Sequence, residues 1–234
     1  MITEPLEAYL IHKLPKGETS LRTYFFTREY GVIECTYRGG RHPKKLIHLQ
    51  PFSTLWILIK EYKQWFYVNK LESTQQTFHL QGHSLFAALY MNELIFYTAA
   101  QLEQETLLFI AYQNSLHSLQ QTKNATDLEI CLRRFEKILL ASIGYSLSLD
   151  PDSALITTIQ PERYYQFRPQ QGLQIANTGI LGAHILAFAH DQFSDPETLK
   201  SAKKLMRQAI HTLLEGRIIQ ARQLFTKQVS TDVL

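Results

Sequence analysis

The sequence predicts an α+β protein, with a five-stranded β-barrel at the N-terminus and an all-helical domain after it. Short runs of β-branched and aromatic residues, separated by turn residues, fill the first 80 residues. The apolar periodicity becomes helical near Gln81-Gly82, and no low-complexity linker or internal repeat interrupts the chain. With 234 residues, of which 45% are apolar, the chain can bury one large or two small cores. We therefore expect two domains, residues 1–80 and residues 81–234.

The barrel is expected to contain five short strands. Lys-Gly, Glu-Tyr-Gly, Gly-Gly and Pro lie between the apolar runs and favour turns. Five strands within about 75 residues are typical of a small closed barrel of the OB type. The expected strands are 6–14, 21–27, 32–37, 54–62 and 65–71.

Helical periodicity accounts for most of the remaining chain. Ser84 is expected to cap a central helix that is apolar nearly all round, and Thr126 and Glu129 have the spacing of a capping box. Asp195 followed by Pro196 predicts the start of the last long helix. Residues 145–176 are expected to be irregular, with a hairpin around residues 168–172. The expected helices are 84–100, 102–121, 126–143, 180–190, 196–216 and 218–227.

The sequence shows no sign of export or membrane insertion. Cys35 and Cys131 both lie in apolar periodic stretches, which favours two buried thiols over a disulfide and suits a reducing compartment. The N-terminal segment has acids and no cationic start, so no signal peptide is expected. The longest apolar stretch, 85–100, is interrupted by Asn92-Glu93 and is too short to span a bilayer. We expect a cytoplasmic protein with no membrane partner.

Positive charge is uneven, although the net charge is only +3. Residues 1–80 carry 11 Lys and Arg against 7 acids, residues 81–150 carry 4 against 7, and residues 151–234 carry 9 against 7. Local basic patches of this kind indicate a polyanionic partner. The first patch spans residues 21–45 and contains Arg22, Arg28, Arg38, Arg41, Lys44 and Lys45.

Aromatic residues lie among these cations and suggest a platform for single-stranded nucleic acid. Bases stack on aromatic faces while cations follow the phosphate backbone. About half of the rings in a small barrel must belong to the core, and strand alternation puts Phe25 on the opposite face from Tyr24 and Phe26. Gly39 and Gly40 let the chain turn tightly or let the backbone approach a ligand. The aromatic residues are Tyr24, Phe25, Phe26, Tyr30 and Tyr37.

The second patch is one face of the last long helix. At 100° per residue, Lys200, Lys203, Lys204 and Arg207 fall on one side and the apolar residues on the other. Ordinary solvated faces mix signs to form i,i+4 pairs, whereas residues 200–227 contain seven Lys and Arg and one acid. This face therefore favours an acceptor for phosphates or for an acidic peptide, with a plain solvated face as the alternative.

The sequence argues against catalysis and against a metal site. It lacks a phosphate-binding GxxxxGK[ST] loop, a GxSxG motif and a recognisable Cys/His pair. His79 and His83 are four residues apart, but Gly82 lies between them and no carboxylate has ligand spacing. Asn92-Glu93, inside an apolar helix, is either a catalytic pair or, more commonly, a pair that hydrogen-bonds to backbone or to an arginine in the core.

Five segments, in order along the chain, resemble the bacterial RecO family of DNA repair proteins. They cover most of residues 5–226, and their order makes the resemblance specific. Members of this family have an N-terminal OB fold and a helical C-terminal domain, as the periodicity predicts. The segments are GETSLRTYFFTREYGVIECTYRGGR (17–41), LQPF (49–52), YMNEL (90–94), LRRFEKILLASIGY (132–145) and AKKLMRQAIHTLLEGRIIQARQLF (202–225).

The resemblance implies a recombination mediator that works without a nucleotide or other cofactor. Such proteins bind single- and double-stranded DNA, anneal complementary strands, and act with RecR to load RecA onto DNA coated by the single-stranded-DNA-binding protein, SSB. They work in the bacterial cytoplasm, at the nucleoid. In this chain, the first basic patch would supply the contacts to DNA.

The resemblance also implies that the helical domain binds the acidic, phenylalanine-ended tail of SSB. Arg133 of the LRRFE segment would bind the tail's terminal carboxylate, and cations of the last long helix would bind its acidic residues. An apolar pocket would hold the anchor, although the leucines assigned to it fit a plain core equally well. The residues carried over are Arg133, Leu132, Leu139, Lys203, Lys204 and Arg207.

In one respect the chain departs from the family pattern. Many RecO proteins carry a four-cysteine zinc motif after the Gly-Tyr segment, but no cysteine follows Gly144-Tyr145 here. Zinc is therefore not expected, and residues 146–176 are expected to fold differently from zinc-bearing members.

Three hypotheses for function remain at this point. The first is a non-enzymatic DNA annealer and mediator. The second is a protein-interaction scaffold whose barrel binds a partner and not DNA. The third is an enzyme centred on Asn92-Glu93, which a pocket beside Glu93 would favour.

Overall fold

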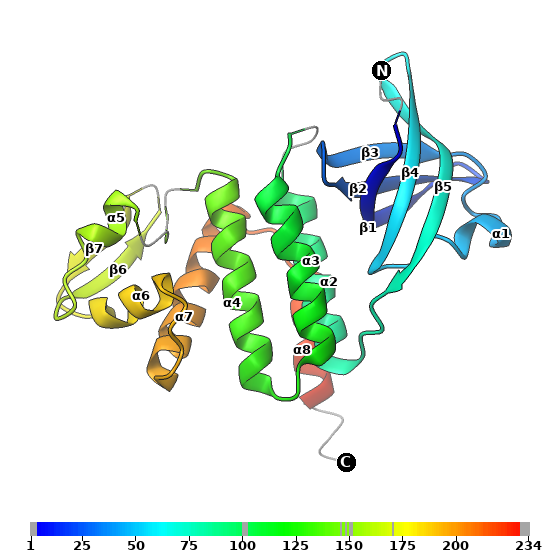
Figure 1. Cartoon of the computed structure of the whole chain (residues 1–234). Coiled ribbons are helices and arrows are strands. Elements are labelled where there is room, and N and C mark those ends of the chain that lie inside the picture. The colour runs from blue at the N-terminus through cyan, green and yellow to red at the C-terminus, as the bar shows by residue number, and fades with distance from the viewer. Residues whose placement is uncertain are drawn as a thin grey trace. The chain divides into compact units, whose positions relative to one another are not determined.

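The computed structural model describes residues 4–99, 103–145, 147, 149, 152–169 and 171–229 (Figure 1). By its internal contacts the chain forms two compact units, Met1–Gln121 with Ile219–Leu234, and Thr122–Ile218. Among the described residues, the first unit holds the barrel and four helices, and the second holds helices and a small sheet. The expected boundary between residues 80 and 81 stays a prediction.

The first unit contains a closed barrel with strand order β1-β2-β3-β5-β4. β3 and β5 pair in parallel, the other pairs are antiparallel, and pairing of β1 with β4 closes the barrel. The five expected strands and the OB-type barrel are thus confirmed. The strands are β1 (Leu6–Lys16), β2 (Ser20–Thr27), β3 (Gly31–Tyr37), β4 (Ser53–Tyr62) and β5 (Trp65–Thr77).

The barrel is packed on both faces of β2. Alternation along the strands sends Phe25, Ile33 and Leu55 into the interior, where each is fully buried. Tyr24 and Phe26, on the outer face of β2, are buried as well: the Phe26 ring lies 5.4 Å from that of Phe109, and the Tyr24 ring lies 4.8 Å from that of Phe96. Two helices of the same unit, which carry Phe96 and Phe109, therefore cover this outer face.

Three long helices complete the first unit: α2 (Gly82–Thr98), α3 (Thr106–Gln121) and α8 (Gln220–Val229). The expected Ser84 cap is wrong, because α2 begins two residues earlier and its N-cap, Gln81, makes no side-chain capping bond. The second helix begins later than expected: residues 103–105 are described and are not helical, and α3 begins at Thr106, while the expected first residue, 102, lies outside the described residues.

A short helix that the sequence did not predict, α1 (Pro43–Leu46), lies between β3 and β4. Proline stands at the first helical position, and the His42 side chain caps the helix by accepting a hydrogen bond from the Lys44 backbone N–H at 3.3 Å. None of the four helical residues is buried, so no apolar periodicity marks this segment.

The second unit combines helices with a three-stranded antiparallel sheet of order β7-β6-β8. The expected hairpin around residues 168–172 is confirmed, whereas the third strand and α5 lie in a region that was expected to be irregular or helical. The α+β fold class holds. The elements are α4 (Ala125–Ser142), α5 (Ala154–Thr157), β6 (Tyr164–Arg168), β7 (Gly172–Ala176), β8 (Ile180–Leu181), α6 (Gly182–Ala189) and α7 (Pro196–Leu213).

Of the two helix caps predicted for the second unit, one is confirmed and one is wrong. Asp195 caps α7 as expected, because its Oδ1 accepts a hydrogen bond from the Glu197 backbone N–H at 2.9 Å. At α4 the capping residue is Asn124 and not Thr126: its Oδ1 accepts from the Asp127 N–H at 2.9 Å. Asn124 stands one residue before the helix, where its extended backbone lets the side chain reach the free N–H groups.

Cys35 and Cys131 are buried thiols that form no disulfide, as expected, and burial raises the pKa of the Cys35 thiol to about 12. Among the described helices, none combines the length and apolar character that crossing a bilayer requires.

Candidate nucleic-acid interface

The loop after β3 turns back over the end of the barrel. Gly39 has a φ of 65°, which favours glycine. A Cβ on Gly40 would lie 2.8 Å from a ring carbon of Tyr37, so this position admits no larger residue without a shift of the ring. The tight turn expected for these glycines is thus present, and the close approach of the backbone to a ligand stays a prediction.

Four cations of this loop and of α1 project from the barrel and have no acidic partner among the described residues. Arg41 Nη1 donates to the Gly17 carbonyl at 3.1 Å, and Lys45 Nζ donates to the Arg38 carbonyl at 2.8 Å. The Arg38 guanidinium carbon lies 4.6 Å from the centre of the Tyr67 ring, and Lys44 is exposed. These contacts hold the side chains in place without neutralising their charge. We call Arg38, Arg41, Lys44 and Lys45 the loop cations.

The other two predicted DNA-binding residues are paired with acids. Arg22 Nε lies 3.3 Å from Glu34. Arg28 is half-buried, donates to Glu7 at 2.6 Å, and lies 4.9 Å from the centre of the Phe109 ring. A phosphate would compete with these carboxylates, so the loop cations are the stronger part of the predicted set.

The predicted aromatic platform is wrong for four of its five rings. Tyr24, Phe25, Phe26 and Tyr37 are at most 8% exposed, because they fill the barrel or lie under helices. Tyr30 is 38% exposed.

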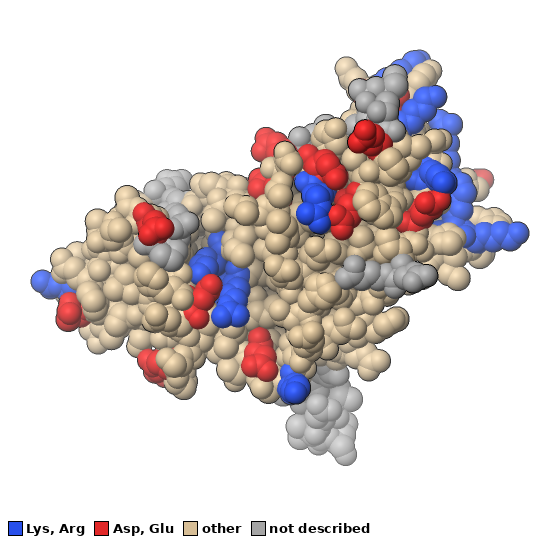
Figure 2. All heavy atoms as spheres, viewed as in Figure 1, with Lys and Arg blue, Asp and Glu red and all other residues tan. Residues whose placement is uncertain are grey.

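More exposed rings lie elsewhere, at the tip of the hairpin between β4 and β5. Tyr62 is 55% exposed and Trp65 is 57% exposed. The sequence does contain a signal for them, because Tyr-Lys-Gln-Trp places a two-residue turn between two aromatic residues. Figure 2 shows Lys and Arg side chains along the same side of the barrel, from the β4–β5 hairpin to α1.

The second basic patch is an exposed face of α7, as predicted. Lys200, Lys203, Lys204 and Arg207 are exposed, while the apolar residues opposite them are buried or half-buried. The expectation that no acid pairs with this face is wrong: Lys203 binds Glu129 of α4 at 2.5 Å, and Lys200 binds Glu197 at 3.3 Å. Lys204 and Arg207 form no ion pair with an acid of the described residues.

Arg133 lies inside the second unit, on α4. It is 6% exposed, donates to Glu136 at 2.8 Å, and lies 3.8 Å from Glu129. Leu132 and Leu139 are also buried, at 6% and 0%. The assignment of these three residues to a peptide tail stays a prediction, and it requires that the buried guanidinium become accessible to the tail.

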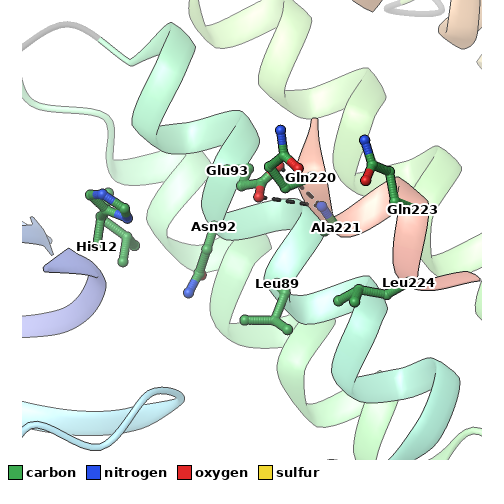
Figure 3. Close-up of a pocket in the computed structure, with 9 residues that line it drawn as sticks. His12, Leu89, Asn92, Glu93, Gln220, Ala221, Gln223 and Leu224 are labelled. Carbon is green, nitrogen blue, oxygen red and sulfur yellow. Dashed lines mark hydrogen bonds between the residues drawn. The ribbon is translucent and has the colours of Figure 1, made fainter. Parts of the chain in front are cut away.

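Asn92 and Glu93 line a cavity of about 290 Å³ in the first unit, between β1, α2 and α8. Figure 3 shows the Glu93 carboxylate directed at the first turn of α8, where it accepts from the Ala221 N–H at 3.3 Å. Asn92 Oδ1 accepts from the Tyr112 hydroxyl at 2.7 Å. Burial raises the pKa of Glu93, and hydrogen bonds from Ala221 and Gln220 oppose that rise. Glu93 thus hydrogen-bonds to backbone, as the structural alternative expected, whereas Asn92 bonds to a tyrosine and not to backbone or to an arginine. The cavity beside Glu93 is the feature that favours the enzyme hypothesis, so the choice between the two roles stays a prediction.

Comparison with known proteins identifies the family. Residues 79–222 match the family model described as "Recombination protein O C terminal". The chain belongs to the RecO family. It is 43% identical over 226 residues to the DNA repair protein RecO of Legionella pneumophila (strain Lens), covering 96% of this chain and 99% of that protein.

More distant RecO proteins match over the same length. The DNA repair protein RecO of Psychromonas ingrahamii is 33% identical, with 97% of this chain and 99% of the relative covered. That of Enterobacter sp. (strain 638) is 31% identical, with 95% and 96% covered. The likeness to RecO therefore extends through both the barrel and the helices.

The zinc site of many RecO proteins does not fit this chain. Its two cysteines, Cys35 and Cys131, cannot form a four-cysteine site. The described residues contain no group of three or more His, Cys, Asp or Glu suited to a metal ion. The segment directly after Tyr145, where the motif would start, lies partly outside the described residues.

Proposed function

We propose that this RecO-family protein is a recombination mediator that performs no chemical step. It binds single- and double-stranded DNA, anneals complementary strands, and acts with RecR to load RecA onto SSB-coated DNA. The observation that supports DNA binding is the set of four loop cations at one end of an OB-type barrel, none paired with an acid of the described residues. Family membership supports the role in repair.

The loop cations promote annealing by neutralising phosphates. Two complementary strands repel each other through their backbones, and a basic surface that displaces their counterions lowers this repulsion. Contacts to phosphate carry no sequence information, which suits a protein that must act on any sequence.

Strand annealing without a nucleotide tests this proposal. Complementary strands with a fluorescent donor and acceptor are mixed with the protein at low and at moderate salt, and a gel shift with a random-sequence strand measures binding. We expect faster annealing than for the strands alone, and weaker binding at the higher salt. Absence of a gel shift at both salt concentrations would favour the alternative, a scaffold that binds proteins and not DNA.

The second unit would bind the acidic tail of SSB through α7. Lys204 and Arg207 support this part of the proposal, because both are exposed and neither pairs with an acid of the described residues. Lys203 would contribute after exchanging Glu129 for an acid of the tail. Arg133 would contribute only by leaving Glu136 or Glu129.

Titration with a tail peptide separates these contributions. We expect the double variant Lys204→Ala/Arg207→Ala to weaken peptide binding up to about tenfold, since each ion pair between exposed side chains contributes about 0.2–1 kcal/mol. Replacing the buried pair as Arg133→Met/Glu136→Met removes the guanidinium without leaving an unpaired charge. Equal peptide affinity for this variant and the parent would remove Arg133 from the site, and equal affinity for the α7 variant would remove that face.

A further inference from the structure

The tip of the β4–β5 hairpin presents two aromatic rings side by side. Tyr62 and Trp65 are directly opposite each other in the strand register, and each is more than half exposed. The two turn residues between them, Lys63 and Gln64, have φ values of 48° and 65°. Two-residue turns of this kind usually contain glycine or asparagine. A left-handed backbone conformation costs conformational energy at residues other than glycine and asparagine. Residues in this conformation are concentrated at functional sites, among them sites that clamp a ligand.

Cations lie close to these rings. Lys63 Nζ is 5.4 Å from the centre of the Tyr62 ring, and Lys16 Nζ is 5.5 Å from that of Trp65. Lys16 is held there by a 2.7 Å hydrogen bond to Thr36 Oγ1. Rings and positive charges therefore alternate on a surface that other parts of the fold keep in position.

The same outward surface continues along the barrel toward the loop cations. Tyr67 pairs with Lys60 across the hairpin and with Thr36 of β3, and Arg38 stacks on the Tyr67 ring. The nearest acid on the hairpin, Glu61, pairs with Phe66 and so belongs to the opposite face of these strands. Glu18, in the turn after β1, is exposed as well.

Trp56, in β4, provides a comparison with Trp65, in β5, on the same hairpin. Its ring is 44% exposed, but its cross-strand neighbours are Glu7 on β1 and Glu72 on β5. An exposed tryptophan is thus present twice, once beside carboxylates and once beside lysines. The surroundings of Trp65 suit a polyanion, and those of Trp56 do not.

We propose that Trp65 and Tyr62 form a stacking site for unpaired bases, which makes the barrel prefer single-stranded over duplex DNA. This inference rests on the proposed function, because it assumes that the barrel binds DNA. Phosphate contacts from the loop cations serve both forms. Only unpaired bases present a free face to a ring, so stacking on Trp65 benefits the single strand alone.

Affinities for a random-sequence single strand and for the same sequence as a blunt duplex test the proposal. We expect Trp65→Ala to weaken single-strand binding about tenfold and duplex binding less than about twofold, since stacking of one base contributes about that factor. The matched control Trp56→Ala should change neither, and Trp65→Phe, which keeps a ring, should retain most of the affinity. Thermal unfolding of each variant verifies that it is folded.

The outcomes separate this inference from the function on which it rests. A parent protein that binds neither form of DNA would overturn both. A parent that binds DNA, with Trp65→Ala affecting both forms equally or neither form, would overturn the stacking site alone.

Tryptophan fluorescence gives a second test, in which the Trp65 ring is retained. The chain has two tryptophans, so in the variant Trp56→Phe all tryptophan emission comes from Trp65. We expect a saturating single strand to quench this emission and a saturating duplex to leave it nearly unchanged. Equal emission with and without a saturating single strand would contradict the proposal.

Discussion

At the scale of single residues, the arginines of the first basic patch differ in what they bind. Arg28 joins β2 to β1 through Glu7 and packs its guanidinium on the Phe109 ring of α3. Arg41 is exposed, and its side chain contacts a backbone carbonyl of a turn. The first arrangement uses the charge to stabilise the fold, whereas the second leaves the charge available to a ligand.

Stability measurements should distinguish these two arginines. We expect Arg28→Ala to lower the free energy of unfolding by about 1–2 kcal/mol, because it removes a hydrogen-bonded ion pair and a cation–π contact. Arg41→Ala should change it by less than about 0.5 kcal/mol, as is usual for an exposed position. Urea denaturation of the two variants and the parent measures both values. If Arg41→Ala were the more destabilising change, the loop cations would have a structural role.

At the scale of elements, the sequence predicts what local patterns determine. The alternating strands of the barrel and the helix α7 follow from the positions of apolar residues and from the Asp195-Pro196 start. α1 was missed because none of its four residues is buried. The small sheet of the second unit was missed in part because β8 is only two residues long.

The face on which an aromatic residue lies depends on distant parts of the chain. Tyr24 and Phe26 alternate with Phe25 as a strand with one wet face would require, yet α2 and α3, more than 50 residues further on, cover that face. Most rings of the platform predicted for residues 21–45 are therefore buried. The more exposed rings, Tyr62 and Trp65, belong to β4 and β5. By contrast, Glu129 and Glu136 stand four and three residues from Arg133, so its pairing could have been predicted from helical spacing.

At the scale of the whole molecule, the net charge does not show which cations are available to a polyanionic ligand. A net charge of +3 combines cations that are paired with acids and cations that are not. In the barrel, Arg22, Arg28 and Lys70 are paired with glutamates, whereas the loop cations are not paired with acids of the described residues. On the proposed function, the positive field for a nucleic acid at the barrel comes from cations of the second group.

The salt dependence of DNA binding tests whether this group forms the interface. Each contact between a cation and a phosphate of a single strand contributes about 0.7 to the slope of log affinity against log salt concentration. We expect Arg41→Ala to reduce the magnitude of this slope by about 0.7 and Arg38→Ala/Arg41→Ala by about 1.4. The matched control is Lys70→Ala, which changes the net charge by the same amount as Arg41→Ala but removes a cation that already binds Glu72, so its slope should equal that of the parent. A slope reduced equally by Lys70→Ala and Arg41→Ala would mean that net charge, and not the loop, governs binding. Slopes unchanged in all three variants would place the DNA on another surface.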